Sequence, residues 1–136
     1  MPLVESSSPL ESLTQKLIRE HWDFYPTAGS RIGRHEYDGR LPDLSPGSLR
    51  RRVTDLREGL DQLMALEPGP VGSEERLGHQ MLEFFLNREL FTFNEMRPLE
   101  DNPMRQTGFL NVGGYIRRDY APIADRVSSA TQALAQ

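Results

Sequence analysis

The strongest constraint on the fold is a seam of apolar residues that recurs at helical spacing after a helix start signal. From Leu49 to Leu63 the intervals are four, three, four and three residues, through Leu49, Val53, Leu56, Leu60 and Leu63. Such spacing places these side chains on one helix face that packs against a neighbour. Ser45 and Pro46 supply a cap and a first-turn proline. A helix is therefore expected from residue 46, and Gly59 should weaken it only modestly.

The N-terminal part of the chain carries a second set of helix signals. Ser8 precedes Pro9, and Glu11 follows three residues after Ser8, a pattern typical of an N-cap with a capping box. Apolar residues then recur at helical spacing, and Pro26 cannot continue the hydrogen-bond ladder. The pattern predicts a first helix over residues 9–25.

Two further helices are expected in the second half of the chain. Ser73, followed by two glutamates, begins a strongly apolar segment that Pro98 ends. Its apolar residues cover more than one face, so we expect it to contact neighbours on two sides. A last amphipathic run begins at Pro122 and has its apolar residues at Ile123, Val127, Ala130 and Leu134. This run reaches the last residue without a C-terminal cap signal, which suggests an interrupted, truncated element.

Glycine and proline separate these segments and indicate long loops at residues 26–46 and 98–114, with a short helical turn near Tyr115. The predicted fold class is all-α, with three to four amphipathic helices joined by long Gly/Pro-rich loops. We expect residues 1–8 to be a flexible N-terminus and residues 9–136 to form a single, partial helical domain.

Composition excludes several classes of function. The 16 basic and 20 acidic residues give a net charge of -4, which lacks the basic footprint of a nucleic-acid-binding protein. The run Arg50 to Arg52 is expected to lie on a solvated helix face. No cysteine is present, which excludes disulfides and thiolate sites. Because no signal peptide and no long apolar stretch occur, we expect a soluble, cytoplasmic protein without a membrane partner.

No complete catalytic or metal site is evident. His35 and Glu36 begin like the zinc motif HExxH, but Gly39 stands where the second histidine would be. His21 and His79 lie on other predicted helices without a metal-ligand spacing. Nucleophile-elbow and phosphate-loop motifs are also missing. We therefore assign no catalytic residue, no metal ligand and no cofactor to this chain.

The loop from Gly33 to Asp43 is the best candidate for a site. It gathers an imidazole, a phenol, a carboxylate and a guanidinium at His35, Tyr37, Asp38 and Arg40. Loops held by rigid helices often carry function, so these residues could face a cleft. Alternatively, Tyr37, Asp38 and Arg40 hold the loop through local turn and cap hydrogen bonds. The sequence leaves both interpretations open.

The same loop carries a resemblance to a known family. The string GRHEYDGRLPDLSPGSLRRRV, the leucine-seamed helix after it and the later string FTFNEMRPLEDNP occur here in that order. Together they resemble the N-terminal region of the bacterial family catalogued as domain of unknown function 885. The similarity extends from about Leu13 to Leu134, and YDGRLPDLSP is its most specific motif.

The resemblance implies a large, mainly helical protein similar to zinc metallopeptidases, with the zinc-binding HExxH helix and the zinc itself beyond these residues. By that analogy the chain is an N-terminal segment, catalytically incomplete alone, that forms a lid or wall of a substrate cleft. Its partner would be the C-terminal peptidase-like portion. The alternative is a free-standing helical interaction module that binds a partner or a second copy through its apolar helix.

Overall fold

The computed structural model describes residues 8–136, and every regular element within this range is helical. The all-α prediction is therefore confirmed, although short helices occur beyond the three to four long ones expected. The structure divides into two compact units: unit 1 contains Pro46–Arg97 and the residues up to Arg19, and unit 2 contains Glu20–Ser45 and Pro98–Gln136. The expected flexible N-terminus lies almost entirely outside the described residues.

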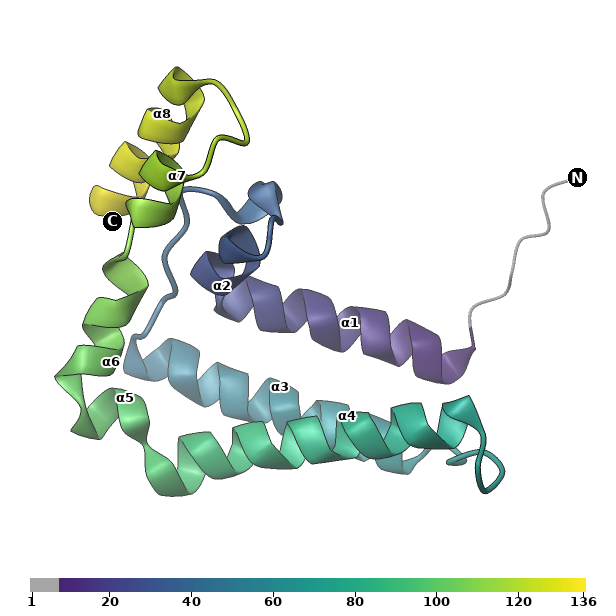
Figure 1. Cartoon of the computed structure of the whole chain (residues 1–136). Helices are drawn as coiled ribbons and strands as arrows, with labels where there is room; N and C mark the ends of the chain where they lie inside the picture. The colour runs from purple at the N-terminus through teal and green to yellow at the C-terminus, as the bar shows by residue number, and fades with distance from the viewer. Residues whose placement is uncertain (1–7) are drawn as a thin grey trace, which may run out of the picture. The chain divides into compact units, whose positions relative to one another are not determined.

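Unit 1 is built from three long helices (Figure 1): α1 (Pro9–Phe24), whose first part belongs to this unit, α3 (Pro46–Met64) and α4 (Glu74–Phe91). The serines predicted to cap the starts of α1 and α4 do so. Ser8 accepts a hydrogen bond from the Glu11 amide at 3.1 Å, and Ser73 accepts one from the Arg76 amide at 3.1 Å. Each bond satisfies an amide that has no partner within its helix.

The core of unit 1 consists of leucines from all three helices. Helices α3 and α4 pack along each other, and α1 lies against them. The fully or nearly buried side chains are Leu10, Leu13, Leu17, Leu56, Leu63 and Leu86. Of the five expected seam residues, Leu56 and Leu63 are buried, and Leu49, Val53 and Leu60 are partly buried. Helix α4 continues into a π-helical turn, Thr92–Met96, before Arg97 takes a left-handed conformation with φ 41° and ends it.

Two expectations for unit 1 are corrected. Arg52 is buried, so the Arg50 to Arg52 run is not a uniformly solvated face. Gly59 does more than weaken the helix modestly. The Cδ2 atom of Leu17 lies only 2.7 Å from where a Cβ of residue 59 would be. The missing side chain lets α1 approach α3 at this point.

Unit 2 contains short helices in both segments predicted as loops. Residues 26–46 include α2 (Pro26–Arg31) and a 3-10 turn, His35–Tyr37. Residues 98–114 contain α5 (Pro98–Asp101), α6 (Pro103–Thr107), the 3-10 turn Gly108–Leu110 and the start of α7 (Gly113–Arg117). The loop predictions were wrong where these short helices form, because a proline at the first helical position starts a helix as readily as it ends one.

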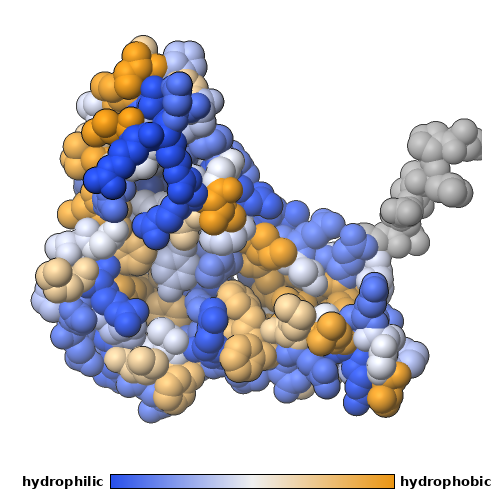
Figure 2. All heavy atoms as spheres, in the orientation of Figure 1, coloured by the Kyte–Doolittle hydropathy of each residue, from blue (hydrophilic) through white to orange (hydrophobic). Residues whose placement is uncertain are grey.

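The last helix, α8 (Ile123–Leu134), forms where the amphipathic run was expected and packs against α7 (Figure 1). Its buried face shares only Ala130 with the predicted apolar residues. Arg126, Ala130 and Ala133 are buried, at spacings of four and three residues. Ile123, Val127 and Leu134 are each at least half exposed. In Figure 2, hydrophobic residues accordingly gather on the visible surface of this part of unit 2, and also over α1 and α4.

Candidate binding site

Asp38 is the centre of a hydrogen-bonded cluster in unit 2. Its Oδ2 accepts a hydrogen bond from the Tyr120 hydroxyl at 2.7 Å and lies 3.1 Å from Nδ1 of His35. Its Oδ1 accepts a hydrogen bond from the Ser30 hydroxyl. Only 11% of the Asp38 side chain is exposed, which strengthens hydrogen bonds to its charge. Asp38 therefore joins α2, the 3-10 turn and the segment after α7.

The Asp38 carboxylate also sets the orientation of the His35 imidazole. A carboxylate can only accept hydrogen bonds, so Nδ1 of His35 is the donor in this pair. The imidazole stacks on the Tyr120 ring with centroids 3.9 Å apart and planes 7° apart. Nε2 has no hydrogen-bond partner among the described residues, and 44% of the side chain is exposed. This nitrogen is therefore available to bind a ligand.

Tyr120 is strongly perturbed by this environment. Burial raises the pKa of the Tyr120 phenol to about 12, and its hydrogen bond to the negatively charged Asp38 raises this pKa in the same direction. Both effects disfavour a second negative charge beside the carboxylate. Tyr120 therefore remains a neutral hydrogen-bond donor throughout the ordinary pH range.

Gly39 shapes the loop next to Asp38. Its φ of 76° lies in the left-handed region, and a Cβ here would come within 2.8 Å of the Gln132 side-chain oxygen. The Gly39 amide donates to the Tyr115 hydroxyl at 2.9 Å, and its carbonyl accepts from the Gln136 side chain at 2.7 Å. The backbone of Gly39 is thus held by the side chains of Tyr115 and Gln136, which lie far along the sequence.

Two of the four candidate residues predicted from sequence, Tyr37 and Arg40, hold the loop in place. Tyr37 is buried, and its Cδ2 lies 3.0 Å from where a Cβ of Gly29 would be. The Arg40 guanidinium lies 5.2 Å from the centre of the Tyr37 ring and 3.3 Å from an Asp23 carboxylate oxygen. Both residues fix the loop to its own unit. His35 and Asp38 belong instead to the polar cluster.

The cluster borders a pocket of about 230 Å³, which we call the unit 2 pocket. The side chains that line it come from α2, from the 3-10 turn and from the segment 111–120. Its polar and charged residues include Thr27, Arg31, His35, Arg117, Arg118 and Tyr120. The structure therefore brings His35 together with three arginines that the sequence had not marked as a group.

Arg126 is the most important residue in this unit that sequence reasoning missed. Its buried guanidinium donates to the backbone carbonyls of Arg118 at 2.7 Å and Ala121 at 2.8 Å, and to the Asp119 carboxylate at 3.1 Å. It thereby fixes the segment that carries Arg117 and Arg118. A signal was present in the sequence, since Arg126 shares a helix face with Ala130 and Ala133.

The other two histidines, His21 and His79, lie outside this cluster and contact other residues of their own units. His79 is buried with Nε2 3.0 Å from the Leu63 carbonyl oxygen in unit 1, and His21 packs against the rings of Trp22 and Tyr25 in unit 2. Within residues 8–136, no three histidine, aspartate or glutamate side chains are grouped to hold a metal ion.

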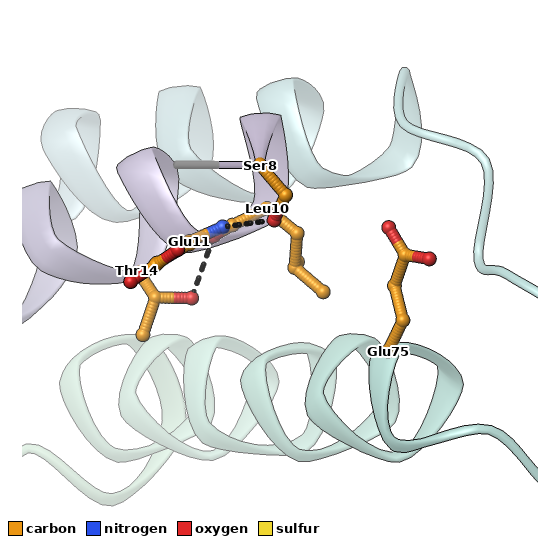
Figure 3. A pocket seen from close by; sticks show the side chains of 5 residues that line it. All are labelled: Ser8, Leu10, Glu11, Thr14 and Glu75. Atoms are coloured by element: carbon orange, nitrogen blue, oxygen red, sulfur yellow. Dashed lines mark hydrogen bonds between the residues drawn. The ribbon is translucent and has the colours of Figure 1, made fainter. Parts of the chain in front are cut away.

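A second concave region, in unit 1, lies between the start of α1 and the start of α4 (Figure 3). It measures about 480 Å³ and is bordered by Leu10, Glu11 and Glu75 together with two hydroxyl residues. Those hydroxyls are already used: Ser8 accepts from the Glu11 amide, and Thr14 donates to the Leu10 carbonyl at 2.7 Å. The unit 2 pocket, with its several converging donors, is therefore the stronger candidate site.

The chain matches no family model, no curated protein and no solved structure. Its family resemblance thus rests on the sequence motifs alone. Among residues 8–136, the helices are too short or too polar to cross a membrane.

Proposed function

We propose that this chain is the N-terminal helical segment of a larger metallopeptidase-like protein and is catalytically incomplete by itself. The motif YDGRLPDLSP and the ordered strings that follow it support the family resemblance. The observation that carries the proposal is an uncovered apolar stripe on α4.

The stripe consists of four large side chains at spacings of four, three and seven residues, which share one helix face. Their exposed fractions are 58% for Leu77, 64% for Met81, 69% for Phe84 and 56% for Phe91. The opposite face of α4 supplies Leu86 to the core of unit 1. A contiguous exposed apolar surface of this kind marks an interaction site. The proposed occupant is the peptidase-like remainder of the same protein.

The role proposed for the His35–Arg40 loop is a wall or lid of the substrate cleft. Such a wall has to hold its shape while substrate binds. Asp38 fixes the loop through Ser30 and Tyr120, and Arg40 ties it to Asp23. These contacts give the loop the rigidity that this role requires.

The test compares the 136-residue chain with a version extended through any downstream coding sequence that encodes an HExxH helix. We expect stoichiometric zinc and peptide hydrolysis only in the extended protein. Zinc and hydrolysis in the short chain, or their absence from both proteins, would reject the proposal.

The α4 stripe is tested in the same pair of proteins with Phe84→Glu. Its matched control is Val71→Glu, because Val71 is exposed in unit 1 but lies outside the stripe. Neither change should alter the unfolding free energy of the short chain by more than about 0.5 kcal/mol. In the extended protein only Phe84→Glu should lower stability and hydrolysis. Equal effects of both substitutions there would show that the stripe is not the contact surface.

The same stripe also supports the alternative of a free-standing interaction module. In that case the short chain would associate with a second copy of itself through α4. Light scattering separates the two ideas, because a dimer that Phe84→Glu converts to a monomer would favour the module.

A further inference from the structure

The unit 2 pocket has an unbalanced positive charge. Arg31, Arg117 and Arg118 line it, and no carboxylate side chain from residues 8–136 does. No carboxylate oxygen of the described residues lies within 4.0 Å of a guanidinium nitrogen of these three arginines. Three guanidinium groups without a carboxylate partner around one cavity favour an anionic ligand.

The neighbouring carboxylates already have other partners. Glu36 pairs with Arg34 at 3.2 Å, and Asp119 pairs with Arg126 at 3.1 Å. The Asp38 carboxylate is directed to the hydroxyls of Ser30 and Tyr120 and to His35. The arginines of the pocket are therefore not neutralised by the protein around them.

A neutral hydrogen-bond donor adds to these charges. The Thr27 hydroxyl lines the pocket without a side-chain partner among the described residues. Guanidinium groups match phosphate and carboxylate oxygens with two parallel hydrogen bonds each. The pocket thus combines charge with several donors, the requirement for binding a group that has many acceptor oxygens.

Size and charge distinguish the candidate anions. A pocket of about 230 Å³ is smaller than the roughly 300–1,000 Å³ typical of sites for drug-sized ligands, so the ligand is small. A phosphate monoester has about 1.5 to 2 negative charges at pH 7 and three acceptor oxygens. A single carboxylate would neutralise only one of the three arginines. We propose that the unit 2 pocket binds a small phosphate monoester whose phosphoryl group contacts Arg31, Arg117 and Arg118.

Arg118 is held in place before a ligand arrives. The Arg118 side chain donates to the backbone carbonyl of Arg31, which links the two sides of the pocket. Buried Arg126 binds the carbonyl of Arg118 from the other side of the segment. Such preorganisation lowers the entropic cost of binding. The inference concerns this chain alone and does not depend on the proposed peptidase role.

The test uses calorimetric titration of the whole chain with inorganic phosphate at constant ionic strength, and with acetate as the carboxylate probe. We expect phosphate to bind at least tenfold more tightly than acetate. Arg117→Gln should weaken phosphate binding at least tenfold. Arg117 makes no hydrogen bond with its side chain among the described residues, so this change should leave the fold intact.

The matched control is Arg105→Gln, an exposed arginine of unit 2 that does not line the pocket. It should leave the phosphate affinity unchanged. A second variant, Arg31→Gln, should reproduce the loss from the other side of the pocket. Undetectable phosphate binding, equal binding of acetate, or equal effects of Arg117→Gln and Arg105→Gln would each overturn the proposal.

Discussion

The hydroxyl of Tyr120 donates a 2.7 Å hydrogen bond to the Asp38 carboxylate, although 82 residues separate them in the sequence. The same tyrosine stacks on His35, so it holds both polar residues of the candidate loop. This contact is a central connection between the 3-10 turn and the segment after α7.

Replacing Tyr120 with phenylalanine should remove this hydrogen bond and keep the ring stacking. Because the acceptor is charged, we expect a loss of about 1.5–3 kcal/mol in the unfolding free energy, measured by urea denaturation. The control is Tyr37→Phe, since Tyr37 is buried in the same unit by packing and makes no side-chain hydrogen bond with a described residue. A Tyr120→Phe protein as stable as the parent would contradict this account.

Stability should also depend on pH through Tyr120. Its pKa is about 12 in the folded chain, against an ordinary value of 10.0. The unfolded chain therefore loses this proton first, and deprotonation favours unfolding. The contribution of the raised Tyr120 pKa to the unfolding free energy is complete below pH 10 and is lost as the pH rises from 10 to about 12. Urea midpoints across this range should fall more steeply for the parent than for Tyr120→Phe, and parallel curves would reject the assignment.

Two glycine substitutions in unit 1 should have opposite effects. Gly59→Ala places a Cβ 2.7 Å from buried Leu17, and overpacking of this kind costs about 1–3 kcal/mol, partly offset by the higher helix propensity of alanine. Gly78→Ala in α4 meets Leu10 at an ordinary 3.6 Å and should stabilise the chain by about 0.5–1 kcal/mol. Thermal melts of both variants measure the difference. Stabilisation by Gly59→Ala would show that α1 is not closely packed there.

Arg126→Met should destabilise unit 2. It removes the donors to the carbonyls of Arg118 and Ala121 and leaves these groups without that partner, at a cost of about 2–4 kcal/mol. Hydrogen exchange should then increase in the segment 115–121. Arg105→Met is the control, because this exposed arginine in α6 makes no side-chain hydrogen bond or ion pair with another described residue. Unchanged exchange in Arg126→Met would mean that the segment is held by other contacts.

The accuracy of the sequence predictions differed between long and short elements. The starts of α3 and α4 and the position of α8 were predicted because caps, first-turn prolines and apolar spacing are local signals. Helices α2, α5 and α6 were missed because each is six residues or shorter, too short to show a periodic apolar pattern.

The candidate loop was found because His35, Tyr37, Asp38 and Arg40 concentrate reactive groups in one short segment. Their separate environments could not be predicted. Asp38 meets Tyr120, and Tyr37 is buried against Gly29, only because distant segments pack together in unit 2. Arg117 and Arg118 gave no sign of a site because the role proposed for them depends on Arg31 lining the same pocket.

The sequence by itself determined that the described chain is helical and where its long helices begin, because helix starts and apolar faces depend on residues within one or two turns. Tertiary structure decided which side chains are buried and which polar groups meet. Arg52 and Arg126 look like surface residues in the sequence but lie inside their units. Burial depends on the face that a neighbouring helix covers, and that neighbour is supplied by residues far along the chain.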